Sequence, residues 1–149
     1  AWTSWVAVSE WGDNSDGLII ADHECNEYYT AKRYNALAHF SKFVPVGSKV
    51  ISNEKDVNDR VAWKIKNQMG FVILNKTNCA SFLTPDGSIV VVIVNDDAGC
   101  TFNFEGISGR DNLKIYTTND RYDLKLTYDG EYKQEVEIPG LSITTLIFS

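Results

Sequence analysis

The sequence predicts a mainly β protein, with an antiparallel β-sandwich of about eight strands over residues 48–149 and a strand–loop–helix segment over residues 1–47. Two observations lead to this prediction. After residue 47, short apolar or alternating runs separated by turn residues recur every 8–12 residues or so, which is typical of sandwiches and jelly rolls. Residues 30–44 are the one stretch with clear helical periodicity.

The totals exclude two classes of partner. At 149 residues, with 44% hydrophobic and 23% charged residues, the chain has the composition of a globular domain. The formal net charge is −6 and Lys and Arg form no run, so we expect no nucleic-acid partner. The apolar stretch at residues 88–94 is far shorter than the roughly 18 residues that a membrane span needs, so we expect no membrane partner.

The first part of the chain predicts three elements. Residues 2–9 form a mostly apolar strand, residues 10–17 a polar loop, and residues 18–21 a second extended piece. A helix follows from Thr30, its predicted N-cap, to Val44, where Pro45 ends it. Its predicted apolar face carries residues at i, i+3, i+4 and i+7 spacing, namely Tyr34, Leu37, Ala38, Ser41 and Val44.

The second part of the chain predicts β structure throughout. Apolar or alternating runs occupy residues 50–51, 61–66, 71–74, 78–84, 88–95, 100–106, 113–118, 123–130, 134–140 and 142–149. Pro85, Asp86 and Gly87 separate two of these runs and predict a tight turn, because Pro fixes φ and Gly accepts a positive φ.

The ionisable and sulfur-containing residues indicate no metal site or cofactor. Cys25, Cys79 and Cys100 allow at most one disulfide, and three thiols are favoured; if a pair exists, we expect Cys79 with Cys100, on either side of strand 88–94. His23 and His39 lack the spacing of a ligand pair, and His39 is interpreted as a packed or surface residue.

The polar loop carries acidic residues whose alternative interpretations are an acid/base pair, a calcium loop or a turn. Glu10, Asp13, Asp16 and Asp22 are too loosely patterned for the first two, so the turn is favoured.

Five segments occur in an order that carries a family resemblance. They are SWVAVS (4–9), DGLI (16–19), YYTAKRYNALAHFSKFVPVGSKVI (28–51), PDGSIVVVIVND (85–96) and IPGLSITTLIF (138–148). Together they resemble the C-terminal portion of glycoside hydrolase family 30, particularly its endo-β-1,6-galactanase-like branch. The sequence VPVG at 44–47 departs from that family's IRPG.

The resemblance implies a (β/α)8 barrel with a β-sandwich on its side. Residues 1–47 would be the end of the barrel (last strand, loop and final helix), and residues 48–149 the sandwich. The two catalytic glutamates would precede Ala1, so this chain would contain no catalytic residue, and whether it acts as an enzyme stays open. Its partners would be a polysaccharide or oligosaccharide and the barrel, in the same or a separate chain, in an extracellular setting.

Tryptophans are the best candidates for sugar contact. By resemblance, Trp5 matches the tryptophan of the last barrel strand, and Trp11 would be a second platform with Glu10 as a hydrogen-bonding neighbour. Trp2 is a further substrate-binding candidate. The alternative for Trp2 and Trp5 is burial in a core, which is also the expectation for Trp63.

Three functions compete. The first is an accessory, C-terminal part of a glycoside hydrolase; the second is a free-standing carbohydrate-binding module that uses the tryptophans with Tyr28 and Tyr29; the third is a structural or adhesion sandwich. A strand–loop–helix segment in front of the sandwich favours the first, because an independent module is expected to begin at its own first strand.

Overall fold

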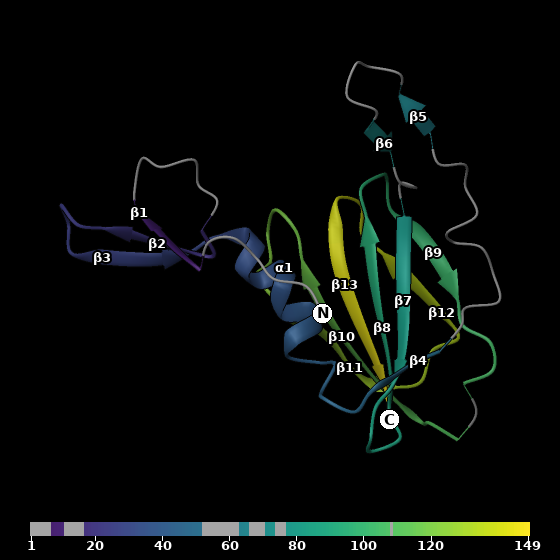
Figure 1. Cartoon of the computed structure of the whole chain (residues 1–149). Coiled ribbons are helices and arrows are strands. Elements are labelled where there is room, and N and C mark those ends of the chain that lie inside the picture. Colours follow the sequence, from purple (N-terminus) through teal and green to yellow (C-terminus); the bar gives the residue numbers. More distant parts are fainter. Residues whose placement is uncertain (1–6, 11–16, 52–62, 66–70, 74–76, 108) are drawn as a thin grey trace.

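The computed structural model describes residues 7–10, 17–51, 63–65, 71–73, 77–107 and 109–149. Its central element is an antiparallel six-stranded sheet with the order β11-β10-β13-β8-β7-β4 (Figure 1). The strands are β4 (Lys49–Ile51), β7 (Thr77–Leu83), β8 (Ile89–Asn95), β10 (Asn112–Thr118), β11 (Lys125–Glu131) and β13 (Ser142–Phe148). The mainly β, antiparallel prediction is therefore confirmed.

Smaller elements accompany this sheet. Strands β9 (Cys100–Asn103) and β12 (Glu135–Ile138) form an antiparallel pair, as do β5 (Trp63–Ile65) and β6 (Phe71–Ile73). Near the beginning of the chain, β1 (Val8–Glu10), β2 (Ile19–Asp22) and β3 (Glu27–Thr30) form a third sheet, which leads into helix α1 (Lys32–Ser41). Within the part of the chain that the structure describes, no helix has the length and apolar character of a membrane span.

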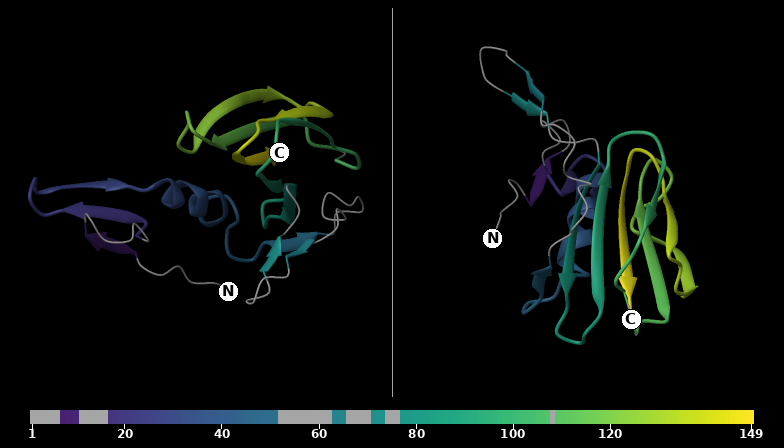
Figure 2. Two further views of the ribbon diagram at one scale, coloured as in Figure 1. Left: turned by 90° about the horizontal axis from the view of Figure 1, so that it is seen from above. Right: turned by 90° about the vertical axis from the view of Figure 1, so that its right-hand side faces the viewer.

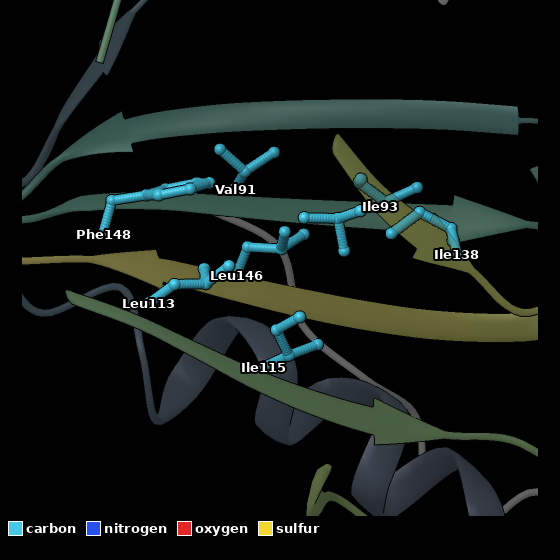
Figure 3. Packing of buried hydrophobic residues seen from close by; sticks show 8 residues of the cluster. Val91, Ile93, Leu113, Ile115, Ile138, Leu146 and Phe148 are labelled. Carbon is cyan, nitrogen blue, oxygen red and sulfur yellow. The ribbon is translucent and has the colours of Figure 1, made fainter. Parts of the chain in front are cut away.

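Helix α1 and the pair β9–β12 cover the two faces of the six-stranded sheet. One buried cluster, on the β9–β12 side, is drawn from β8, β10, β12 and β13 and includes Ile93, Leu113, Ile138, Leu146 and Phe148 (Figure 3). The other, on the side of α1, contains Phe43, Val90 and Val92. Figure 2 shows α1 and β1–β3 on one side of the sandwich strands.

Strand β8 explains why the run at 88–94 is continuously apolar. Val90 and Val92 point toward α1, whereas Val91 and Ile93 point toward β9 and β12. A strand buried on both faces needs apolar residues at successive positions rather than in alternation.

The turn between β7 and β8 forms as predicted. The Gly87 N–H donates to the Thr84 carbonyl at 3.0 Å, and Gly87 has a φ of +88°. The Thr84 hydroxyl also donates to the Asp86 carboxylate.

Two details at the beginning of the chain differ from the sequence prediction. Residues 27–30, which were assigned no element, form β3 and pair antiparallel with β2. Thr30 is therefore the end of a strand and not the N-cap; Ala31 is the N-cap, and no side chain caps the helix. The pair β1–β2 is parallel, unlike the remaining pairs of the described residues.

The predicted apolar face of the helix was partly right and partly wrong. Leu37 and Ala38 are half-buried, and Val44 packs against the cluster of Phe43, Val90 and Val92. Tyr34 is 43% exposed and Ser41 is exposed, whereas His39 is fully buried. Helix α1 ends at Ser41, earlier than the predicted Val44. The helix meets the sheet through His39, whose imidazole finds hydrogen-bonding partners there, and Phe43 packs on the sheet just beyond the end of the helix.

His39 joins the helix to two strands. Its Nδ1 lies 2.7 Å from the Thr145 hydroxyl of β13, and its Nε2 lies 2.9 Å from the Thr118 hydroxyl of β10. Hydroxyls can donate or accept, so both ring nitrogens of a neutral imidazole are satisfied. Desolvation by burial lowers the pKa of His39 from 6.5 to about 4.

Because of His39, the stability of the folded chain is expected to decrease as the pH is lowered. The unfolded chain binds a proton at His39 below pH 6.5, whereas the folded chain binds it only below about pH 4. The contribution is therefore complete above pH 6.5 and is lost progressively as the pH falls from 6.5 to 4. Its size is about 3 kcal/mol. Urea unfolding of the wild type and of His39→Gln at neutral pH and near pH 4.5 checks this. The loss between the two pH values should shrink in the variant, and an equal loss in both proteins would contradict the assignment.

Candidate functional site

The structure describes one of the four predicted sugar-binding residues. Trp2, Trp5 and Trp11 lie outside the described residues, as does the side chain of Trp63. Glu10, at the end of β1, is described and exposed. The candidate site is therefore built from Glu10 and what surrounds it on the sheet of β1, β2 and β3.

Strand pairing places Glu10, Ala21 and Tyr28 in one row. Glu10 is opposite Ala21 in β2, and Ala21 is opposite Tyr28 in β3, so the three side chains share one face of the sheet. Neighbouring strands are roughly 4.8 Å apart, so the backbones that carry Glu10 and Tyr28 are about 10 Å apart. The small Ala21 side chain lies between them, and Tyr28 is 77% exposed.

His23 adds an imidazole beside the carboxylate. Its Nε2 lies 3.6 Å from Glu10 Oε1, and the two side chains are 74% and 78% exposed. His23 follows β2 at the start of the turn to β3, where the Asp22 carboxylate accepts hydrogen bonds from the backbone N–H groups of Glu24 and Cys25. This part of the sheet thus presents a carboxylate, an imidazole and a phenol ring to solvent. Such groups can hydrogen-bond hydroxyls and stack on a sugar ring.

The other face of this small sheet packs inward. Ser9 and Ile20 are buried on it, and Gly17 lies against β1. A Cβ at Gly17 would lie 2.8 Å from both the Ser9 nitrogen and the Ile19 carbonyl oxygen. Glycine is therefore required at this position of DGLI, because any side chain would clash with β1.

Further acidic residues that the structure describes lie on the strands and loops of the sandwich. Asp96, Asp97 and Asp120 line an open depression beside Gly140 and Leu141. Among the described residues, no three His, Cys, Asp or Glu side chains are grouped as metal ligands would be. Hydrogen bonds, chiefly from the Thr84 hydroxyl, lower the pKa of Asp86, which keeps it ionised and is opposite to the shift that a general acid requires.

The helix that follows this sheet is fixed to the sandwich at three places. At its first turn, Lys32 Nζ donates to the Asn119 carbonyl at 2.8 Å and pairs with Asp123 at 2.7 Å, both in the β10–β11 loop. His39 forms the buried contacts described above, and beyond the helix the Phe43 ring lies 4.4 Å from that of Tyr116. The sequence analysis missed these roles; the one signal in the sequence was the spacing of His39 and Phe43, one helical turn apart.

The sandwich has a recognised family. Residues 46–146 match the family model described as the glycosyl hydrolase family 30 beta sandwich domain. The chain belongs to this family. The match covers the β9–β12 pair and the six-stranded sheet as far as Leu146 in β13, so the family 30 sandwich corresponds to the structural core described above.

The likeness to solved structures extends beyond the sandwich to nearly the whole of this chain. A GH30 endoxylanase from Clostridium papyrosolvens matches at a TM-score of 0.61 and 18% identity, covering 99% of this chain and 32% of the other. The catalytic domain of GH30 xylanase C from Talaromyces cellulolyticus matches at a TM-score of 0.65 and 19% identity, covering 97% of this chain and 30% of the other. A conserved exported protein from Bacteroides fragilis matches at a TM-score of 0.69 and 19% identity, covering 95% of this chain and 28% of the other. This family 30 chain therefore spans about a third of the length of these proteins.

Glu10 is expected to be dispensable for folding. Its contact with His23 is exposed, and even exposed ion pairs contribute little to stability. We expect Glu10→Gln to change the free energy of unfolding by less than about 1 kcal/mol. Urea unfolding at neutral pH measures this, and a larger loss would show that Glu10 has a structural role.

Proposed function

We propose that this chain is the C-terminal part of a glycoside hydrolase, in which the sandwich supports a catalytic (β/α)8 barrel and residues 1–47 form the end of that barrel. The family 30 sandwich match supports this proposal. So does the fold likeness to the two xylanases, which extends over nearly the whole of this chain. The catalytic glutamates then belong to the barrel portion, and this chain alone is not catalytic.

The attachment of α1 is the observation that carries the proposal. An accessory sandwich can hold a barrel in place only if some barrel element is fixed to it. Helix α1 is fixed through Lys32, the fully buried His39 and Phe43. The contacts combine an ion pair, buried hydrogen bonds and aromatic packing, so the helix and the sandwich behave as one packed unit.

The proposed substrate is a β-linked polysaccharide of the galactan or xylan type. The galactan alternative rests on the resemblance of the sequence to the endo-β-1,6-galactanase-like branch. The xylan alternative rests on the xylanases with the same fold. The further proposals are extracellular export, which agrees with the exported Bacteroides fragilis protein, and no nucleic-acid partner, which agrees with the net charge of −6.

The activity test compares this chain with the longer protein that includes the barrel. We expect the longer protein to release reducing sugars from xylan or β-1,6-galactan and this chain to release none, because the catalytic pair lies in the barrel. Starch, which is α-linked, is the control substrate. Release of sugar by residues 1–149 alone, or no release from either β-linked polymer by the longer protein, would overturn the proposal.

A second candidate function is sugar contact by the sheet of β1–β3. The row of Glu10, Ala21 and Tyr28 favours it, because an exposed ring and a carboxylate flank a small residue. It is compatible with the first function and also with a free-standing binding module.

Affinity electrophoresis in gels containing xylan or galactan tests this second function. We expect Tyr28→Ala and Glu10→Gln each to weaken retardation several-fold. Tyr34→Ala is the matched control, since Tyr34 is an exposed tyrosine on α1 and outside the row. Trp5→Ala tests the platform expected from the sequence. Equal retardation of the wild type, Tyr28→Ala and Glu10→Gln would exclude the row as a sugar contact.

A further inference from the structure

Two cysteines lie in the two β layers of the sandwich, on the sides that face each other. Cys79 belongs to β7, where it is paired with Ile93 of β8. Cys100 is the first residue of β9, where it is paired with Ile138 of β12. Both cysteines pack, partly buried, against the same core cluster, to which Ile93 and Ile138 belong. The cluster therefore receives one thiol from each layer.

Asn95 brings the two thiols to the same end of that cluster. Its Nδ2 lies 3.7 Å from Cys100 Sγ, and its Oδ1 accepts a hydrogen bond from the Thr77 hydroxyl at 2.9 Å. Thr77 is two residues before Cys79 in β7, so the two residues share a face and are about 7 Å apart along the strand. Cys100 Sγ is thus held over the β7–β8 pair beside Asn95, and Cys79 is two residues further along β7 from Thr77, the strand partner of Asn95.

We propose that Cys79 and Cys100 are a redox site, whose disulfide joins the β9–β12 layer to the six-stranded sheet when the chain meets an oxidant. In the structure all three cysteines of the chain are thiols. A disulfide needs Cβ atoms about 3.8 Å apart. Cys100 is the first residue of β9 and directly follows the loop at 96–99, which hydrogen bonds join to Asn95, so forming the bond would require a shift at the beginning of a strand rather than at its centre.

The oxidation is a thiol–disulfide exchange with a small disulfide such as oxidised glutathione. One cysteine thiolate attacks the glutathione disulfide and releases one glutathione thiolate. The second cysteine thiolate then attacks the mixed disulfide and releases the other. The two protein thiols are oxidised to one disulfide, and one oxidised glutathione is reduced to two molecules of glutathione, which take up the two protons.

The bond would change the stability of the sandwich. It would close the chain between residues 79 and 100, which limits the unfolded state, and it would connect two layers that otherwise meet through side-chain packing. A loop of this length predicts an increase in Tm of about 10 °C. Burial raises the pKa of the Cys79 thiol, so formation of the bond should be slow near neutral pH and faster in alkaline buffer.

The test uses residues 1–149 with Cys25→Ser, because Cys25 is exposed and could form bonds between molecules. The protein is incubated with oxidised glutathione, remaining thiols are blocked with N-ethylmaleimide, and the intact mass and proteolytic peptides are measured. We expect a loss of about 2 Da, the mass of two hydrogen atoms, and a Cys79–Cys100 linked peptide. Thermal unfolding should show the higher Tm, reversed by dithiothreitol.

Cys79→Ser and Cys100→Ser, each in the Cys25→Ser background, are the matched variants. Their Tm in reducing buffer shows that they fold, and oxidised glutathione should not raise it. Blocking of both thiols of the Cys25→Ser protein by N-ethylmaleimide after oxidation would overturn the proposal. So would a stable glutathione adduct in place of the linked peptide. The readout is mass, so this result is independent of the outcome of the activity test.

Discussion

The six-stranded sheet carries apolar side chains on both of its faces, and the other described elements that pack on it keep these faces from water. Strand β8 shows this most clearly, with Val92 buried against the helix side and Ile93 buried against β9 and β12. Neither helix α1 nor the β9–β12 pair alone would keep the sheet from water, because each covers only one face. The helix is therefore as much a part of the sandwich as the second β layer, although the family match begins only at residue 46, after the helix.

The contact between helix and sheet is unusual in being polar at its centre. A buried imidazole loses its hydration, and the hydroxyls of Thr118 and Thr145 replace it with hydrogen bonds of fixed direction. Apolar packing alone would allow the helix to rotate or slide, whereas two hydrogen bonds to different strands define its register. Under the proposed function, this register determines how the end of the barrel is oriented on its supporting domain.

The sequence predicted those features that depend on neighbours in the chain. The strands from β7 to β13 and the Pro85–Gly87 turn follow from local periodicity and turn chemistry, and the structure has them. The helix was found, but its face was not, because His39 looks polar in the sequence and becomes a core residue only when two threonines from distant strands meet it. Of the candidate site, Glu10 was proposed from the sequence and stays a prediction, whereas its row with Ala21 and Tyr28 depends on strand register. That register could not be foreseen, because the polar residues of β3 carry no clear strand pattern.

The position of β13 affects the order in which the fold can be assembled. Of the described strands it is the last in the chain, and it lies between β8 and β10 at the centre of the sheet. The β7–β8 and β10–β11 hairpins can each form as soon as they are synthesised, but they share no edge until β13 pairs with both. During synthesis on the ribosome, the sheet would therefore exist as two separate parts, β4–β7–β8 and β10–β11, with unpaired edges until residues 142–148 emerge from the exit tunnel.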